Sequence, residues 1–205
     1  MIVIQARTGS QRFPRKILAS LHGRTILEHV VERARQIRGI QGIVVATTDR
    51  AADDPVVVLC QSLGVHVFRG SESDVLDRYY QCATVFRADP IVRITADCPL
   101  LDPDISSGIV EAYALGGYRY VSNVGDGTDG WDTEIMSYEA LEWTWKRAHA
   151  PQDREHVTTY MRRNLPPGAI LSKIVRRIPN GEKWSVDVPA DLDRVAAILD
   201  AATVG

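Results

Sequence analysis

The chain begins with a basic segment whose residue types suit an anionic ligand. Residues 1–40 hold eight lysines and arginines but only two acids, although the formal net charge of the whole chain is −2. The loop after the first apolar segment carries cations, a hydroxyl and a glycine: Arg7, Arg12, Lys16, Ser10 and Gly9. Such side chains, with flexible backbone amides entering a helix, suit a polyphosphate. The loop matches neither a GxxxxGKS/T phosphate loop nor a GxGxxG fingerprint, so a solvated basic loop is the alternative interpretation.

Two carboxylates at the ends of predicted strands could hold a metal ion. Asp97 ends an apolar run within Thr95-Ala96-Asp97-Cys98-Pro99, and Asp187 follows a second run about 90 residues later. Mg²⁺ usually takes one or two carboxylates together with phosphate oxygens and water. The alternative for Asp97 is a turn cap, and the alternative for Asp187 is a cap beside the next helix.

The spacing of apolar residues predicts the elements that must position these side chains. Short continuous apolar runs predict strands at residues 1–5, 43–47, 65–68, 90–95 and 118–123. Helical spacing predicts helices near residues 26–37, 53–63, 74–87 and 103–115. This alternation is typical of a parallel sheet covered on both faces. We therefore predict an α/β fold, a doubly wound and mostly parallel sheet in a three-layer sandwich, with ligands beyond the carboxyl ends of the strands.

The pattern changes after residue 124, with no repeat or linker. It predicts a strand at 131–137, helices at 138–147 and 152–164, strands at 170–178 and 183–186, and a closing helix at 189–202. These elements fit a lobe that returns to the first sheet. We therefore expect one domain, residues 1–205, in which 1–124 and 125–205 form two halves.

Composition places the chain among soluble globular proteins, with 45% apolar and 24% charged residues. No apolar run is long enough to span a membrane, and the first residues lack the pattern of a signal peptide. We expect a cytoplasmic protein without membrane or nucleic-acid partners, because a nucleic-acid-binding domain is normally basic throughout. The three cysteines lack CxxC spacing, which predicts neither a disulfide nor a thiolate zinc site.

Six segments together carry a resemblance to a known family. They are residues 4–16 (IQARTGSQRFPRK), 45–49 (VATTD), 68–79 (FRGSESDVLDRY), 92–100 (VRITADCPL), 154–158 (REHVT) and 186–192 (VDVPADL). The first segment resembles the nucleotide-binding signature of the sugar cytidylyltransferases, which include the CMP-KDO and CMP-neuraminate synthetases. The resemblance is strongest to the branch of spore-coat polysaccharide biosynthesis proteins (SpsF-like).

The resemblance implies a nucleotide-diphospho-sugar-transferase-like fold and a Mg²⁺-dependent transfer of CMP from CTP to a sugar or sugar acid, with release of pyrophosphate. It implies that residues 1–124 bind the nucleotide and that 125–205 form the acceptor-side lobe. Residues implied to hold the triphosphate are Arg7, Gly9, Ser10, Arg12 and Lys16; those implied to face base and ribose are Ala6, Arg69, Gly70, Ser71 and Thr95. Asp97 and Asp187 are implied to hold Mg²⁺, and Arg7, Arg12, Lys16 and Asp97 are the candidate catalytic residues.

Two positions depart from the family pattern. Arg15 stands where glycine usually precedes the motif lysine, and Ala96 stands where glycine usually precedes the metal aspartate. Ala96 matters little unless a positive φ is required there. These departures leave open a non-catalytic nucleotide-binding or sensing protein on the same fold. A nucleotidyltransferase that uses UTP or another NTP, and a homodimer, are also left open.

The candidate acceptor site lies in the second half. Its polar residues are Asp132 and Glu134 on a predicted strand, and Arg154, Glu155 and His156 at the predicted start of a helix. A helix start favours anions, and arginine binds a carboxylate through two parallel hydrogen bonds. We therefore expect Arg154 to face the same cleft as Asp97. His156 is a candidate base near neutral pH, with packing or capping as the alternative.

Overall fold

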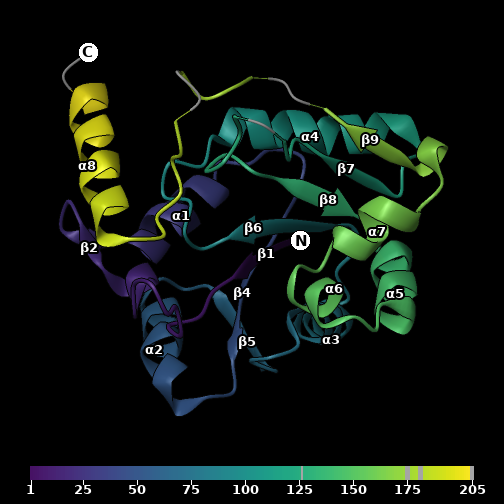
Figure 1. The fold of residues 1–205 in the computed structure, drawn as a ribbon, viewed down its shortest axis with the longest axis horizontal. Coiled ribbons are helices and arrows are strands. Elements are labelled where there is room, and N and C mark those ends of the chain that lie inside the picture. The colour runs from purple at the N-terminus through teal and green to yellow at the C-terminus, as the bar shows by residue number, and fades with distance from the viewer. Residues whose placement is uncertain (126, 174–175, 180–181, 204–205) are drawn as a thin grey trace.

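The computed structural model describes residues 1–125, 127–173, 176–179 and 182–203, and its centre is a seven-stranded sheet (Figure 1). The strands are β1 (Ile2–Gln5), β4 (Ile43–Thr48), β5 (His66–Gly70), β6 (Ile91–Thr95), β7 (Tyr120–Ser122), β8 (Glu134–Met136) and β9 (Ile170–Ser172). Their order is β5-β4-β1-β6-β8-β7-β9. Only β8 runs antiparallel to its neighbours among the described strands of this sheet. The predicted mostly parallel, doubly wound sheet is therefore confirmed.

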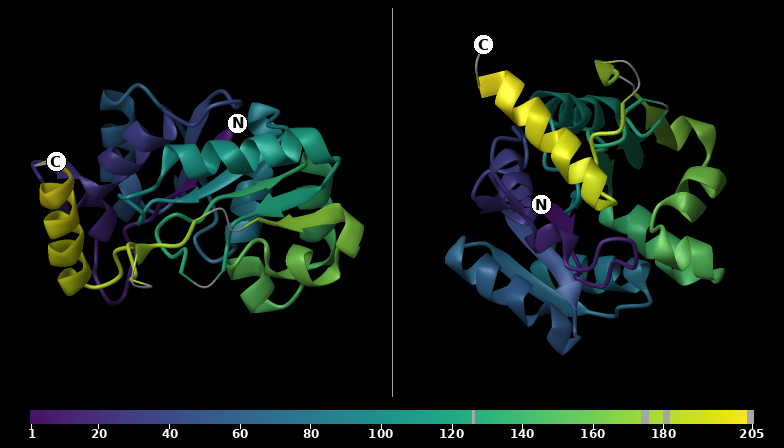
Figure 2. Two further views of the ribbon diagram at one scale, coloured as in Figure 1. Left: turned by 90° about the horizontal axis from the view of Figure 1, so that it is seen from above. Right: turned by 60° about the vertical axis from the view of Figure 1, so that its left-hand side comes forward.

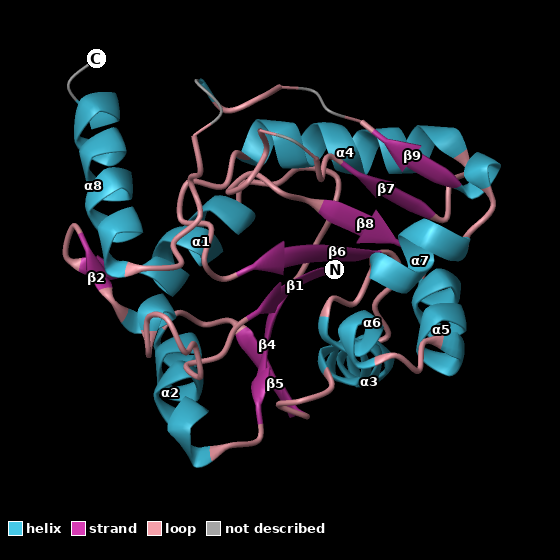
Figure 3. Cartoon of the chain, viewed as in Figure 1, coloured by secondary structure: helices cyan, strands magenta, loops and turns pink. Residues whose placement is uncertain are grey.

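Helices cover both faces of the sheet and make three layers (Figure 3). The first face packs against α1 (Ile26–Ala34), α2 (Asp54–Ser62) and α4 (Pro103–Gly116). The second face packs against α3 (Val75–Phe86), α5 (Tyr138–Arg147) and α7 (Thr159–Asn164), with the short α6 (Pro151–Glu155) against α3. Short 3₁₀ turns η1 (Lys16–Leu18), η2 (Ala51–Asp53) and η3 (Pro167–Ala169) complete the connections. None of the described helices is long and apolar enough to cross a membrane.

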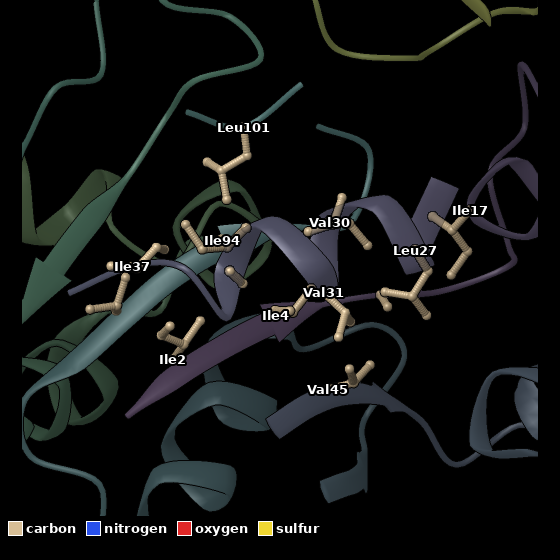
Figure 4. Close-up of a cluster of buried hydrophobic side chains, with 14 of the residues drawn as sticks. Ile2, Ile4, Ile17, Leu27, Val30, Val31, Ile37, Val45, Ile94 and Leu101 are labelled. Carbon is tan, nitrogen blue, oxygen red and sulfur yellow. The ribbon is translucent and has the colours of Figure 1, made fainter. Parts of the chain in front are cut away.

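The core beneath α1 shows how the local sequence sets this packing. Thr25 caps α1 and Glu28 completes the predicted capping box. The apolar positions of the helix, spaced three and four apart, then face β1, β4 and β6 (Figure 4). Leu27, Val30 and Val31 are fully buried there, and burial of each contributes about 1.5–3 kcal/mol. This packing holds the carboxyl ends of β1 and β6 in fixed positions.

The closing helix α8 (Pro189–Thr203) lies beside the hairpin of β2 (Ser20–Leu21) and β3 (Arg24–Thr25) (Figures 1 and 2). A small apolar cluster joins them, in which Val195 of α8 and Val186 just before it pack with Leu21 and Ile26. The contact brings the end of the chain back to its first loop, so that Asp187 reaches the carboxyl edge of the sheet.

The single helix predicted at 152–164 is wrong, because two short helices, α6 and α7, stand there. The break lies at Val157, which takes a φ of +57°. A β-branched residue rarely adopts this conformation, and it costs about 1–3 kcal/mol. Complete burial of the Val157 side chain in the second apolar layer offsets that strain.

Two predicted strands in the last third also differ. Of the strand predicted at 170–178, Ile170–Ser172 forms β9, and residues 174–175 lie outside the described part of the chain. No described residue of the segment 183–186 is in a strand. Trp184 N donates to Asp129 O and Val186 N donates to Asp97 O, both at 2.8 Å. Because these two hydrogen bonds go to different loops, they fix the segment in place without pairing it with a strand of the sheet.

Candidate active site

A pocket of about 730 Å³ opens where β1 and β6 end, and we call it the larger pocket. Gln5 and Thr95, the last residues of those strands, lie in its wall. The predicted phosphate and metal residues that line it are Arg7, Gly9, Ser10, Arg12, Lys16, Asp97 and Asp187, and Thr95, predicted to face the base and ribose, lines it as well. Ala6 is buried behind the wall, where its N–H donates to Ala46 O. The structure thus brings residues far apart in the sequence to the edge where a parallel sheet binds ligands.

The first loop is anchored by a residue that sequence reasoning assigned only to a helix start. Asp53 accepts hydrogen bonds from Thr8 N at 2.7 Å and Thr8 Oγ1 at 2.6 Å, and its other oxygen accepts from Thr48. Burial alone would raise the pKa of Asp53, but these hydrogen bonds lower it. Asp53 therefore stays ionised and fixes the loop over the pocket. The acidic pair before Pro55 was the only sequence signal for it.

The departure at Arg15 is explained by the backbone of the same loop. Arg15 has a φ of +59°, a left-handed conformation in which glycine is unstrained. This explains why glycine usually stands there, and it shows that arginine preserves the turn. Ala96 is not among the described residues with positive φ, so an alanine side chain costs nothing at that position.

Lys16 joins the two predicted metal ligands directly. Its Nζ donates to Asp97 Oδ2 at 2.7 Å, to Asp187 Oδ1 at 2.8 Å and to Val186 O at 2.7 Å. All three protons of the ammonium group are therefore used. The side chain of Lys16 is only 10% exposed. Three oxygens from two distant segments thus converge on one cation.

The charges around Asp187 hold this cluster in its ionised form. Burial alone would raise the pKa of Asp187, but Lys16 and Lys183 hold it well below its usual range. Burial would likewise lower the pKa of Lys16, but Asp97 and Asp187 outweigh that effect and raise it. Arg12 adds a contact of 3.0 Å to Asp187. The cluster is therefore a set of charges that neutralise one another.

Two arginines of the loop, Arg7 and Arg12, line the larger pocket and keep part of their surface exposed. Arg12 is 66% exposed, and Arg7 lies 3.9 Å from Glu155 with 36% of its side chain exposed. Glu155 accordingly lines the larger pocket, where it faces a predicted phosphate residue. Exposed ion pairs of this kind contribute little stability, so an anionic ligand can replace the carboxylates at small cost.

A second cavity of about 280 Å³, the smaller pocket, adjoins the first at Thr95. Three of the predicted acceptor residues line it, namely Asp132, Glu134 and His156. Burial raises the pKa of Asp132 to about 6, although its bond from Thr128 Oγ1 works in the other direction. The pocket also contains Arg93 and Arg162, neither of which sequence reasoning had singled out. Arg93 lies within the segment 92–100 that carries the family resemblance, but no role was assigned to it there, and Arg162 lies in no such segment.

The expectation that Arg154 faces the cleft of Asp97 is wrong. Its Nε and Nη2 bind the carboxylate of Asp74, at 2.5 to 3.0 Å, and Nη1 donates to the carbonyls of Trp145 and Ala148. Arg154 also stands at the end of α6 and not at a helix start. All of its donor groups hold α6 against α3 and α5, so it lines neither pocket.

The turn predicted to face the base and ribose is only partly at the larger pocket. Arg69 donates to Thr48 O and Arg50 O and pairs with Asp54 at 2.7 Å. Its guanidinium is therefore held by the segment between the end of β4 and the start of α2. Neither Arg69 nor Gly70 nor Ser71 lines the larger pocket. The next residues of the same turn, Glu72 and Ser73, do line it.

Comparison with known proteins agrees with the fold and the site. The sequence model of the cytidylyltransferase family matches residues 1–178 of the chain. The chain belongs to the cytidylyltransferase family. It is 35% identical over 169 residues to the spore coat polysaccharide biosynthesis protein SpsF of Bacillus subtilis, covering 79% of this chain and 69% of that protein. This confirms the resemblance that the sequence motifs indicated.

One further sequence relative and one solved structure match most of this chain. An uncharacterized protein of Methanocaldococcus jannaschii is 44% identical over 162 residues, covering 79% of this chain and 66% of the relative. The chain thus spans about two thirds of the length of these curated relatives. A cytidylyltransferase structure from Leptospira borgpetersenii has a TM-score of 0.90 and 31% identity, covering 98% of this chain and 86% of that one. The predicted nucleotidyltransferase fold is confirmed.

Proposed function

We propose that this member of the cytidylyltransferase family transfers CMP from CTP to a sugar or sugar acid and releases pyrophosphate. The observation that carries the proposal is the convergence of Lys16, Asp97 and Asp187 in the wall of a pocket that adjoins a second one at Thr95. A two-substrate reaction needs two such sites side by side. The name of the relative SpsF supports a product used in surface polysaccharide synthesis.

The larger pocket suits a nucleoside triphosphate. Its volume of about 730 Å³ lies within the range of small-molecule sites. Arg7 and Arg12 present open cationic surface, and Gly9 and Ser10 add flexible backbone and a hydroxyl. Cations placed along a triphosphate stabilise the charge that develops on the leaving pyrophosphate, and one such contact contributes about 3–4 kcal/mol.

The donor set around Lys16 fits a divalent metal ion. Three oxygens already surround one cation, the ammonium of Lys16, at 2.7 to 2.8 Å. No group of three or more His, Cys, Asp or Glu side chains suited to a metal exists among the described residues, and two carboxylates with phosphate oxygens are a usual set for Mg²⁺. We assign Asp97 and Asp187 as the ligands. Bound there, Mg²⁺ would neutralise charge on the phosphates and on the leaving group.

The residues of this chain then have separate tasks. Lys16 and Arg12, released from the carboxylates, would pair with phosphate oxygens. The smaller pocket would hold the acceptor with its attacking hydroxyl toward Thr95, where the two pockets meet. Asp132 and Glu134 can accept hydrogen bonds from sugar hydroxyls. His156, which lines the same pocket, is the candidate base.

The test is release of pyrophosphate from each of the four NTPs, with a panel of sugars and sugar acids and with Mg²⁺ or EDTA. We expect turnover with CTP, with Mg²⁺ and with one class of acceptor. Turnover with UTP alone would correct the nucleotide, and tight CTP binding without turnover on any acceptor would favour a sensing role over catalysis.

A further inference from the structure

Arg93 lies in β6 between the two pockets and contacts one residue of each. Its Nη1 donates to Glu134 Oε1 at 3.1 Å, and its Nη2 donates to Gln5 Oε1 at 3.3 Å. Glu134 and Arg93 line the smaller pocket, whereas Gln5 lines the larger one. Strand register explains the arrangement, because Arg93 stands directly opposite Glu134 of β8 and Gln5 is the last residue of the neighbouring β1.

The Arg93–Glu134 pair is a costly feature of the sheet. The two side chains are only 15% and 4% exposed, and a buried ion pair is commonly no more stabilising than apolar residues of similar size. Arg93 Nε and Glu134 Oε2 are buried, and neither has a hydrogen-bond partner within the described part of the chain. Such unsatisfied groups destabilise a fold, so their presence calls for a purpose other than stability. Both residues line the smaller pocket, which indicates that the purpose lies in the site.

The contact with Arg93 determines which way the Gln5 amide points. A guanidinium only donates hydrogen bonds, so Gln5 must turn its oxygen toward Arg93. The amide nitrogen Nε2 then points away from Arg93, and no described residue accepts a hydrogen bond from it. Since Gln5 lines the larger pocket, this N–H₂ group is a donor available to a ligand there.

We propose that Arg93 is a positioning residue for nucleotide binding: it fixes Gln5 so that the amide nitrogen donates to an oxygen of the bound nucleotide. Glu134 holds Arg93 from the other side. The inference rests on the proposed function, because it takes the larger pocket to be the nucleotide pocket. Arg93 itself does not line that pocket, so its effect on the nucleotide passes through Gln5.

The test is a double-mutant cycle on CTP affinity, measured by calorimetry with Mg²⁺ and no acceptor. Gln5→Met keeps the length of the side chain but removes the donor, and it should raise the Kd about fivefold, the effect of losing one hydrogen bond. Arg93→Lys keeps the charge beside Glu134 but loses the planar fork that reaches two partners. It should raise the Kd by a similar factor. The double variant should bind CTP within about twofold of Gln5→Met.

Arg119→Lys is the matched control, because Arg119 makes the same 3.1 Å pair with a glutamate, Glu139, and lines neither pocket. Its CTP affinity should stay within twofold of that of the unchanged protein. If Arg93→Lys does not fold, as its melting curve will show, Arg93→Gln replaces it in the cycle. An unchanged Kd in Gln5→Met, or equal effects of the Arg93 variant with and without Gln5, overturns the inference. Failure of the unchanged protein to bind CTP would instead refute the proposed function.

Discussion

Lys16→Met should increase the affinity of the free protein for Mn²⁺, although it removes a residue of the proposed nucleotide site. The ammonium of Lys16 now occupies the space between Asp97 and Asp187 that the metal would need. A divalent ion must therefore displace Lys16 before it can bind. On the proposed function the nucleotide would provide the new partner for Lys16, so in the unchanged protein we expect metal and nucleotide to bind cooperatively.

The geometry sets the size of the effect. Two unit charges about 4 Å apart interact by about 4 kcal/mol at an effective dielectric constant near 20. Lys16 is 10% exposed, and its partners Asp97 and Asp187 are 27% and 22% exposed, so desolvation and screening cancel much of this attraction. A net cost of about 1.4 kcal/mol for displacing Lys16 is a conservative value. Its removal should lower the Mn²⁺ Kd at least about tenfold.

The assay is the concentration of free Mn²⁺ read by electron paramagnetic resonance, at pH 7.5 and without nucleotide. Lys146→Met is the control, because it removes the same charge from an exposed pair with Glu142 at 3.0 Å on α5. Asp97→Asn added to Lys16→Met should abolish the gain. A Mn²⁺ affinity that is unchanged or weaker in Lys16→Met would refute the view that the lysine stands in for the metal.

Four further outcomes follow from other contacts. Asp97→Asn and Asp187→Asn should each abolish Mg²⁺-dependent pyrophosphate release with an unchanged circular dichroism spectrum, and a shifted spectrum would point to a structural role. Arg154→Ala should lower the free energy of unfolding by about 3 kcal/mol, because it leaves the Asp74 carboxylate without its partner; an effect on acceptor KM alone would contradict this. Asp53→Ala should loosen the first loop and weaken CTP binding about tenfold or more, as calorimetry can show. Burial raises the pKa of Asp132 in the folded protein to about 6, so the folded state binds this proton more tightly than the unfolded state does. The free energy of unfolding should therefore fall by at most about 3 kcal/mol as the pH rises from 4 to 6. Urea denaturation at each pH measures this fall, and Asp132→Asn should make the free energy of unfolding less dependent on pH in that range.

Local patterns were sufficient for the sheet and for most of the helices. Continuous apolar runs mark β1, β4 and β6, and the capping box at Thr25 marks the start of α1. These signals act over a few residues, where spacing and capping determine the structure. The break at Val157 has no such signal, because its positive φ is imposed by burial between distant elements. The misplacement of Arg154 has the same origin, since Asp74, its partner, lies 80 residues away.

The candidate site shows the same limit in its electrostatics. From the sequence, the cationic first loop was predicted to bind phosphate, and the two aspartates were predicted to bind a metal ion. In the folded chain Lys16 is bound to both Asp97 and Asp187, because a cation and two carboxylates brought to one sheet edge attract each other. Residue types could therefore predict which groups meet, but not which contacts they make with one another. On the proposed function, we expect binding of a metal with its nucleotide to be an exchange of partners within this cluster, in which Lys16 and Arg12 would pair with phosphate oxygens and Asp97 and Asp187 would hold the metal.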